Sequence, residues 1–95
     1  MNLQSFTDTI TSPTPPSGLS VYLEALWYDA NGEWNKAHDL IDDHEDKDAA
    51  WLHAYLHRKE GDIFNADYWY RKAGKIRPAI GLDEEWMNLA NYFTK

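Results

Sequence analysis

A thirteen-residue segment that occurs twice, 29 residues apart, constrains this chain more than any other feature. Residues 25–37 align with residues 54–66: alanine meets alanine at both ends, Gly32 meets Gly61, and an acidic residue follows each glycine. A fixed period of this size is typical of stacked repeats in which each unit is one helical hairpin. The repeat therefore predicts an all-α fold that contains two antiparallel helical hairpins.

Apolar periodicity in the rest of the chain also predicts helices and no strands. The expected helices cover residues 18–31, 33–45 and 48–60, a segment after Asp62 and a segment from Asp83. The last of these has the clearest amphipathic pattern, with apolar residues at i, i+3, i+4 and i+7. Those residues are Trp86, Leu89, Ala90 and Phe93. We expect this fifth helix to cap the second hairpin by packing on the fourth helix, near Trp69 and Ala73.

The chain divides into an N-terminal arm and one helical domain. Residues 1–17 are rich in Ser, Thr and Pro, so we expect a flexible, extended arm. We expect residues 1 to about 14 to be dispensable for folding, although Phe6 and Ile10 could dock on the helices. The helical repeat domain, residues 18–95, would consist of repeat 1 (18–46), repeat 2 (47–78) and a capping helix (82–94).

The composition argues against several classes of protein. A net charge of −7 and a pI near 4.8 disfavour nucleic acid and anionic membrane surfaces as partners, because phosphate binding needs a basic surface. Without cysteine there are no disulfides, thiolate zinc sites or cysteine nucleophiles. The first residues lack the basic and apolar regions of a signal peptide, and no apolar stretch approaches membrane-spanning length. We expect a cytoplasmic protein that binds neither nucleic acid nor membranes.

The repeat resembles the tetratricopeptide superfamily, and residues 68–74 look like its Sel-like branch. Repeat 2 matches the family pattern with Ala54, Gly61, Ala66, Tyr70, Ala73 and Pro78, and repeat 1 matches it with Ala25, Tyr28, Gly32 and Ala37. Small residues let the two helices of a hairpin approach closely, and glycine permits the turn between them. The chain departs from the family in its period of 29 rather than 34 residues and in having only two units.

The resemblance implies a protein-binding module without catalytic activity or cofactor, whose partner is another protein or a second copy of the chain. In this family the first helix of each unit lines a concave groove. Carried over to this chain, the partner-binding residues are Tyr22, Leu26, Asp29, Trp51, Tyr55 and Arg58. Aromatic residues and arginine are typical of binding hot spots. In a chain this short, the fifth helix could instead lie in the groove, which would make the same residues part of the core. We expect the groove to stay at least partly open.

An alternative site involves polar residues at positions that the family fills differently. His53 and His57 lie four apart, so both rings point to one side of their helix. With Glu24 from the neighbouring helix they would form a Glu-His-His cluster that could support a small-molecule or metal-dependent activity. The sequence favours a polar network without chemistry, because no HExxH motif strengthens the cluster. The acidic residues 42–48 lack the pattern of a calcium loop, so no metal site is predicted there.

Overall fold

The computed structural model describes residues 1–95 and contains helices but no strands, which confirms the predicted all-α fold class. The elements are α1 (Leu3–Asp8), the 3₁₀ helix η1 (Thr9–Thr11), α2 (Val21–Ala30), α3 (Trp34–Ile41), α4 (Lys47–Glu60), α5 (Ile63–Lys72) and α6 (Leu82–Phe93). None of these helices is both long and apolar enough to cross a membrane.

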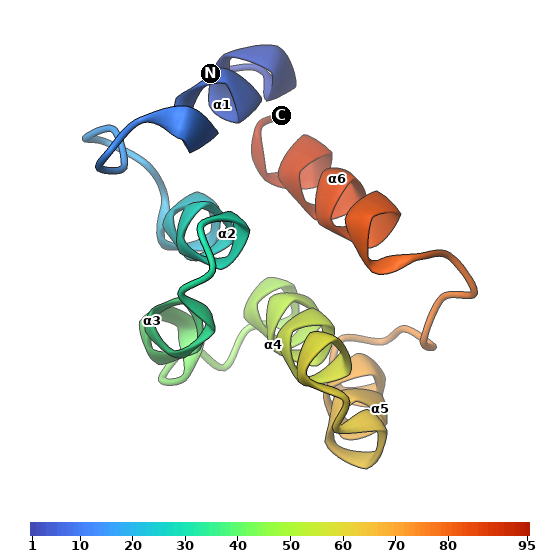
Figure 1. Cartoon of the computed structure of the whole chain (residues 1–95). Helices are drawn as coiled ribbons and strands as arrows, with labels where there is room; N and C mark the ends of the chain where they lie inside the picture. Colours follow the sequence, from blue (N-terminus) through green and yellow to red (C-terminus); the bar gives the residue numbers. More distant parts are fainter.

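Helices that follow one another in the two repeats pack in pairs, α2 with α3 and α4 with α5, and α3 also contacts α4 (Figure 1). Both hairpin turns contain a glycine in the left-handed region, Gly32 with φ = 79° and Gly61 with φ = 92°. Residues with a Cβ rarely adopt this conformation, which accounts for glycine at the same place in both repeats. The predicted equivalence of the two glycines is confirmed.

Side-chain caps begin most of the repeat helices. The Asp46 carboxylate accepts a hydrogen bond from the backbone N–H of Ala49 at the start of α4 (3.1 Å). Ser20 caps α2 and Asp62 caps α5 in the same way. Each cap satisfies a backbone donor that the helix itself cannot pair, so these boundaries follow from local sequence.

The position of α6 differs from the one predicted. It packs against α1, α2 and α4, whereas the sequence analysis placed it on the fourth helix of the repeats, α5 (Figure 1). Leu89 and Ala90 are fully buried there. Residues 73–81 join α5 to α6 and can span roughly 30 Å when extended, so α6 can return over the first helices of both hairpins. The larger apolar surface lies on that side, and covering it is favourable.

The N-terminal segment also differs from the extended arm predicted for residues 1–17. It forms α1 and η1, and the Phe6 side chain is fully buried. The Phe6 ring stacks on Trp86 of α6 with 5.9 Å between ring centroids. The indole of Trp27 donates a hydrogen bond to the backbone carbonyl of Thr9 (3.0 Å). Burial of Phe6 therefore makes this polar, Pro-containing segment part of the core.

We predict that Phe6→Ala destabilises the protein by about 3–5 kcal/mol, because it removes a buried aromatic side chain and leaves a cavity. Phe64→Ala is the matched control, since Phe64 is 86% exposed. Its effect should stay within about 0.5 kcal/mol. Chemical denaturation monitored by circular dichroism measures both, and equal unfolding midpoints for the two variants would contradict the packing of α1.

Candidate functional site

The predicted groove is filled by α6. Of the residues assigned to it, Leu26, Asp29 and Tyr55 are buried, while Tyr22, Trp51 and Arg58 are partly buried. Their polar atoms bond to the chain itself, as the following geometry shows. We expected the groove to stay at least partly open. The C-terminal helix lies in it, as in the alternative, and only Tyr22, Trp51 and Arg58 keep part of their surface exposed.

Glu85 of α6 is the centre of the contact between α6 and the repeats. Its side chain is only 1% exposed. Arg58 donates a hydrogen bond to Glu85 Oε1 (2.8 Å), the Trp51 indole donates to Oε2 (3.2 Å), and the Tyr70 hydroxyl lies 2.7 Å from both oxygens. Burial, followed by the hydrogen bond to Glu85, raises the pKa of Tyr70, so its hydroxyl remains a donor. One carboxylate thus joins α6 to both helices of the second hairpin.

Asp29 of α2 is a second buried carboxylate on the same side of the repeats. It accepts hydrogen bonds from the Tyr55 hydroxyl and from Lys59, each at 2.9 Å, and both donors belong to α4. Burial and the nearby Asp29 charge raise the pKa of Tyr55. Asp29 therefore connects the first helices of the two hairpins.

The far end of the groove is closed by aromatic contact. The Tyr22 ring stacks on Phe93 of α6 at 4.6 Å between centroids, with the planes 6° apart. Its hydroxyl donates to Asp46 (2.7 Å), and this bond is the main reason that the pKa of Tyr22 is raised to about 12. The indole of Trp86 donates to the backbone carbonyl of Leu26 (3.2 Å).

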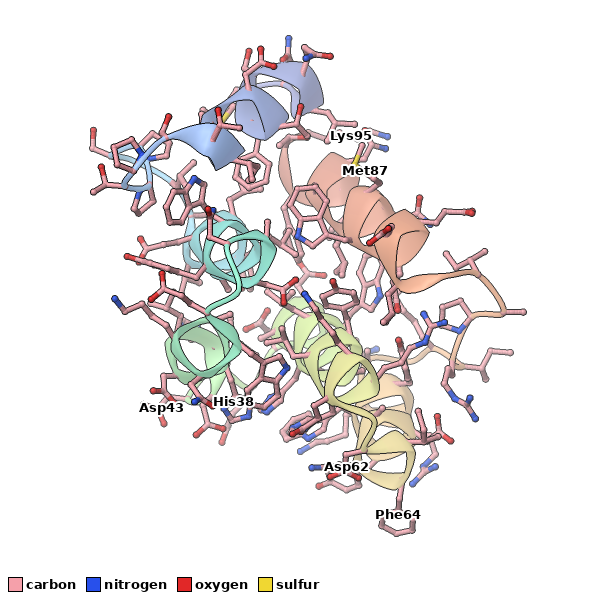
Figure 2. The ribbon with its side chains drawn as sticks, in the orientation of Figure 1. His38, Asp43, Asp62, Phe64, Met87 and Lys95 are labelled. Carbon is pink, nitrogen blue, oxygen red and sulfur yellow. The ribbon has the colours of Figure 1, made fainter.

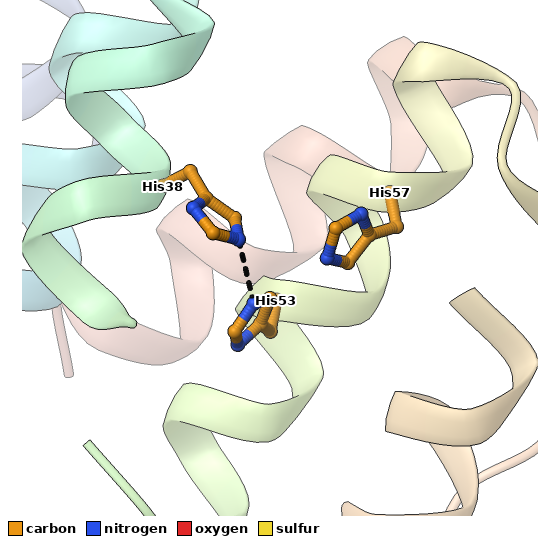
Figure 3. Close-up of side chains that lie close together, drawn as sticks. All are labelled: His38, His53 and His57. Carbon is orange, nitrogen blue, oxygen red and sulfur yellow. Dashed lines mark hydrogen bonds between the residues drawn. The ribbon is translucent and has the colours of Figure 1, made fainter. Parts of the chain in front are cut away.

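A cluster of three histidines lies away from α6, where α3 meets α4 (Figure 3). His38 comes from α3, and His53 and His57 come from successive turns of α4. One ring nitrogen of each lies within 4.8 Å of those of the other two. The Nε2 atoms of His38 and His53 form a hydrogen bond of 2.8 Å (Figure 3).

Tryptophans hold two of these rings in place. The indole of Trp34 stacks on His38 at 5.0 Å with the planes 12° apart, and that of Trp69 stacks on His53 at 3.9 Å with the planes 11° apart. Because Trp34 belongs to α3 and Trp69 to α5, the cluster draws on three helices. Its rings have little freedom to turn.

Two carboxylates border the cluster. Asp42 Oδ1 lies 3.9 Å from His38 Nε2 and 3.8 Å from His53 Nε2. Glu60 Oε2 contacts Nδ1 of His57 at 2.6 Å. Burial, followed by the nearby His38 and His57, lowers the pKa of His53 to about 4, which keeps this ring neutral near pH 7. Imidazole nitrogens and carboxylate oxygens are ligand atoms that bind divalent metal ions.

The Glu-His-His cluster of the sequence analysis needs correction in one member. His53 and His57 do converge, but the groups of side chains that are close enough to share a metal ion do not include Glu24. The third member is His38, which the sequence analysis missed. His38 lies four residues after Trp34 and therefore on the same side of α3. Only that spacing was available in the sequence, because the packing of α3 on α4 is a property of the tertiary structure.

No family model, curated protein or solved structure matches this chain. The tetratricopeptide resemblance therefore rests on the spacing of the residues named in the sequence analysis.

We predict that Glu85→Ala destabilises the protein by about 3–5 kcal/mol, because it leaves the Tyr70 hydroxyl unpaired in the interior and removes the carboxylate partner of the partly buried Arg58 charge. Glu84→Ala provides the control, since Glu84 is exposed in the same helical turn. Its effect should be below about 1 kcal/mol. Urea unfolding at pH 7 measures both variants; a loss for Glu85→Ala no larger than for Glu84→Ala would show that the network does not hold α6.

A second prediction concerns pH. The pKa of His53 is 6.5 in the unfolded chain and about 4 in the folded protein. Protonation of His53 therefore favours the unfolded state. The free energy of unfolding should fall as pH drops from 6.5 to 4, by about 3 kcal/mol over the whole range. Unfolding free energies at pH 7 and pH 5, measured with a chelator present, test this.

In this pH experiment, His53→Gln should flatten the pH dependence, because glutamine does not titrate. His44→Gln should leave it unchanged, since His44 is exposed and outside the cluster. If the free energy of unfolding changed equally with pH in all three proteins, the pH dependence could not be assigned to His53.

Proposed function

We propose that the chain is a protein-binding module without catalytic activity, and that its partner docks on the outer face of α5. The observation that carries this proposal is Phe64, a large apolar side chain that is 86% exposed and projects away from every other element (Figure 2). Neighbouring exposed apolar side chains on an ordered helix are typical of surfaces that bind other proteins, and Tyr68, which is 45% exposed, extends the exposed surface of Phe64.

The position of α5 supports the same proposal. It is the last repeat helix, and α6 covers the groove instead of this end of the stack (Figure 1). Stacked repeats usually end in units with a polar outer face. Here Phe64 and Tyr68 lie four residues apart on one stripe, and Ile63 beside them is 37% exposed. A partner in the groove would first have to displace α6, so the α5 surface is the more accessible of the two.

The charge around α5 indicates what kind of partner fits. Between residues 71 and 77 the chain has four basic residues and no acidic one, although its net charge is −7. Arg77 is paired with Asp67 of α5 (2.9 Å), which leaves Arg71, Lys72 and Lys75 without a salt bridge. The ammonium group of Lys72 lies 5.4 Å from the centre of the Tyr68 ring, which places positive charge at the end of the apolar stripe. An amphipathic helix with acidic flanks would complement this surface. A second copy related by a twofold axis would bring the same basic segment to the interface, so we favour a different protein.

Phe64→Asp tests the proposal, because it removes the exposed aromatic and adds a charge that repels an acidic partner. Chemical crosslinking in cells that produce the protein, followed by mass spectrometry, should capture acidic partners with the wild type and lose them with Phe64→Asp. Met87→Asp is the matched control, since Met87 is 40% exposed on α6 (Figure 2). Met87→Asp should capture the same partners as the wild type.

Two results would overturn this assignment. Identical partners for all three proteins would show that the α5 face is not the docking surface. A concentration-dependent dimer in sedimentation equilibrium that Phe64→Asp abolishes would identify a second copy as the occupant in place of an acidic partner.

A further inference from the structure

We propose that His38, His53 and His57, together with Asp42, form a binding site for a divalent transition-metal ion, with Zn²⁺ the best fit. The site would connect the two hairpins, because His38 belongs to repeat 1 and the other two histidines to repeat 2. None of these four residues takes part in the α5 docking surface.

The geometry is close to that of a bound site. Zinc binds histidine nitrogen at about 2.0–2.1 Å in tetrahedral sites, which places two ligand nitrogens roughly 3.3 Å apart. The Nε2 atoms of His38 and His53 are 2.8 Å apart, so the rings need to separate by only about 0.5 Å to admit the ion. The third nitrogen, from His57, lies within 4.8 Å of the other two.

Asp42 lies beside the three histidines, whose group of mutually close ligand atoms does not include it, and it would supply the fourth ligand by moving closer. Its Oδ1 lies at nearly equal distances from the two Nε2 atoms, 3.9 Å from His38 and 3.8 Å from His53. These separations are about 0.5 Å longer than those between two ligand atoms of one tetrahedral ion. Three imidazoles and one carboxylate form a set of nitrogen and oxygen donors that suits zinc, and geometry would select it over larger ions that prefer oxygen.

The surroundings resemble the outer shell of metal sites. Metal-bound histidines usually donate their second ring N–H to a carboxylate, which fixes the tautomer. Glu60 contacts Nδ1 of His57 at 2.6 Å, which leaves Nε2 facing the other rings (Figure 3). The Nδ1 atom of His53 is buried without a hydrogen-bond partner, so this ring lacks such an outer contact, and its Nε2 contacts His38. The two stacked tryptophans then limit the orientations that the rings can adopt.

The site is also open to solvent on one side. An ion can reach the site from solvent, because the side chains of His38 and Asp42 are 20% and 55% exposed. The buried rings of His53 and His57 would complete the coordination from inside.

Isothermal titration of untagged, chelator-treated protein with ZnCl₂ at pH 7 tests the site. The wild type should bind one equivalent saturably, and its thermal midpoint should rise with Zn²⁺ concentration, because the ion binds only the folded site. His38→Ala should abolish saturable binding. Glu60→Gln should weaken it by about 10–100-fold, the range typical of an outer-shell partner.

His44→Ala is the matched control, because this fourth histidine is exposed on the connection after α3 and lies outside the cluster. It should bind Zn²⁺ like the wild type. Absence of saturable binding by the wild type would overturn the proposal, as would equal losses in His38→Ala and His44→Ala.

A spectroscopic measurement covers the case in which His38→Ala fails to fold, as judged by circular dichroism. Co²⁺ added to the wild type should produce the intense visible absorption of a four-coordinate ion, and Zn²⁺ should displace it. A spectrum that remains that of the hydrated, six-coordinate ion would also overturn the proposal.

Discussion

The buried carboxylate of Glu85 is the interaction on which the arrangement of this protein depends. Removing a carboxylate from water is costly unless it is fully hydrogen-bonded. Arg58, Trp51 and Tyr70 together meet that requirement from α4 and α5. The three donors converge on Glu85 where α6 lies over the repeats, so the network holds α6 in the position where it also covers apolar surface.

The rest of the architecture follows from α6 in the groove. Its apolar stripe covers α2 and α4, and Trp86 then provides the surface on which Phe6 stacks. The N-terminal helix is thereby held by the C-terminal one. Because α6 covers the groove, the outer face of α5 stays exposed, and Phe64 remains in solvent. The proposed docking surface is thus a consequence of how the groove is filled.

Local features of the chain could be predicted well. Gly32 and Gly61 end helices in the left-handed conformation, and Asp62 begins one, because each acts through its own backbone or that of a residue three positions away. Pairing of consecutive helices follows from the short turns between them. These interactions involve neighbours in sequence, so the residue types alone indicate them.

Contacts between distant segments could not be predicted in the same way. Glu85 fits the usual pattern of an acidic residue in the first turn of a helix, and nothing adjacent to it indicates a buried role. Phe6 stands in a segment whose average composition resembles a flexible arm. His38 becomes part of a cluster only because α3 packs on α4. In each case the decisive partner lies in another element.

The sequence by itself therefore determined the helical class, the repeat and the glycines that end the first helix of each hairpin, since periodicity and glycine conformation are local properties. It placed the end of the second helix at residue 45, whereas α3 ends at Ile41, and it predicted no helix before residue 18, where α1 lies. Only the tertiary structure decided that α6 fills the groove, that α1 joins the core and that three histidines converge. The physical reason is that burial and charge pairing depend on which surfaces meet, and several pairings of the same helices satisfy the local pattern equally well. The arrangement with the lowest free energy is the one that covers the largest apolar surface and also pairs every buried charge.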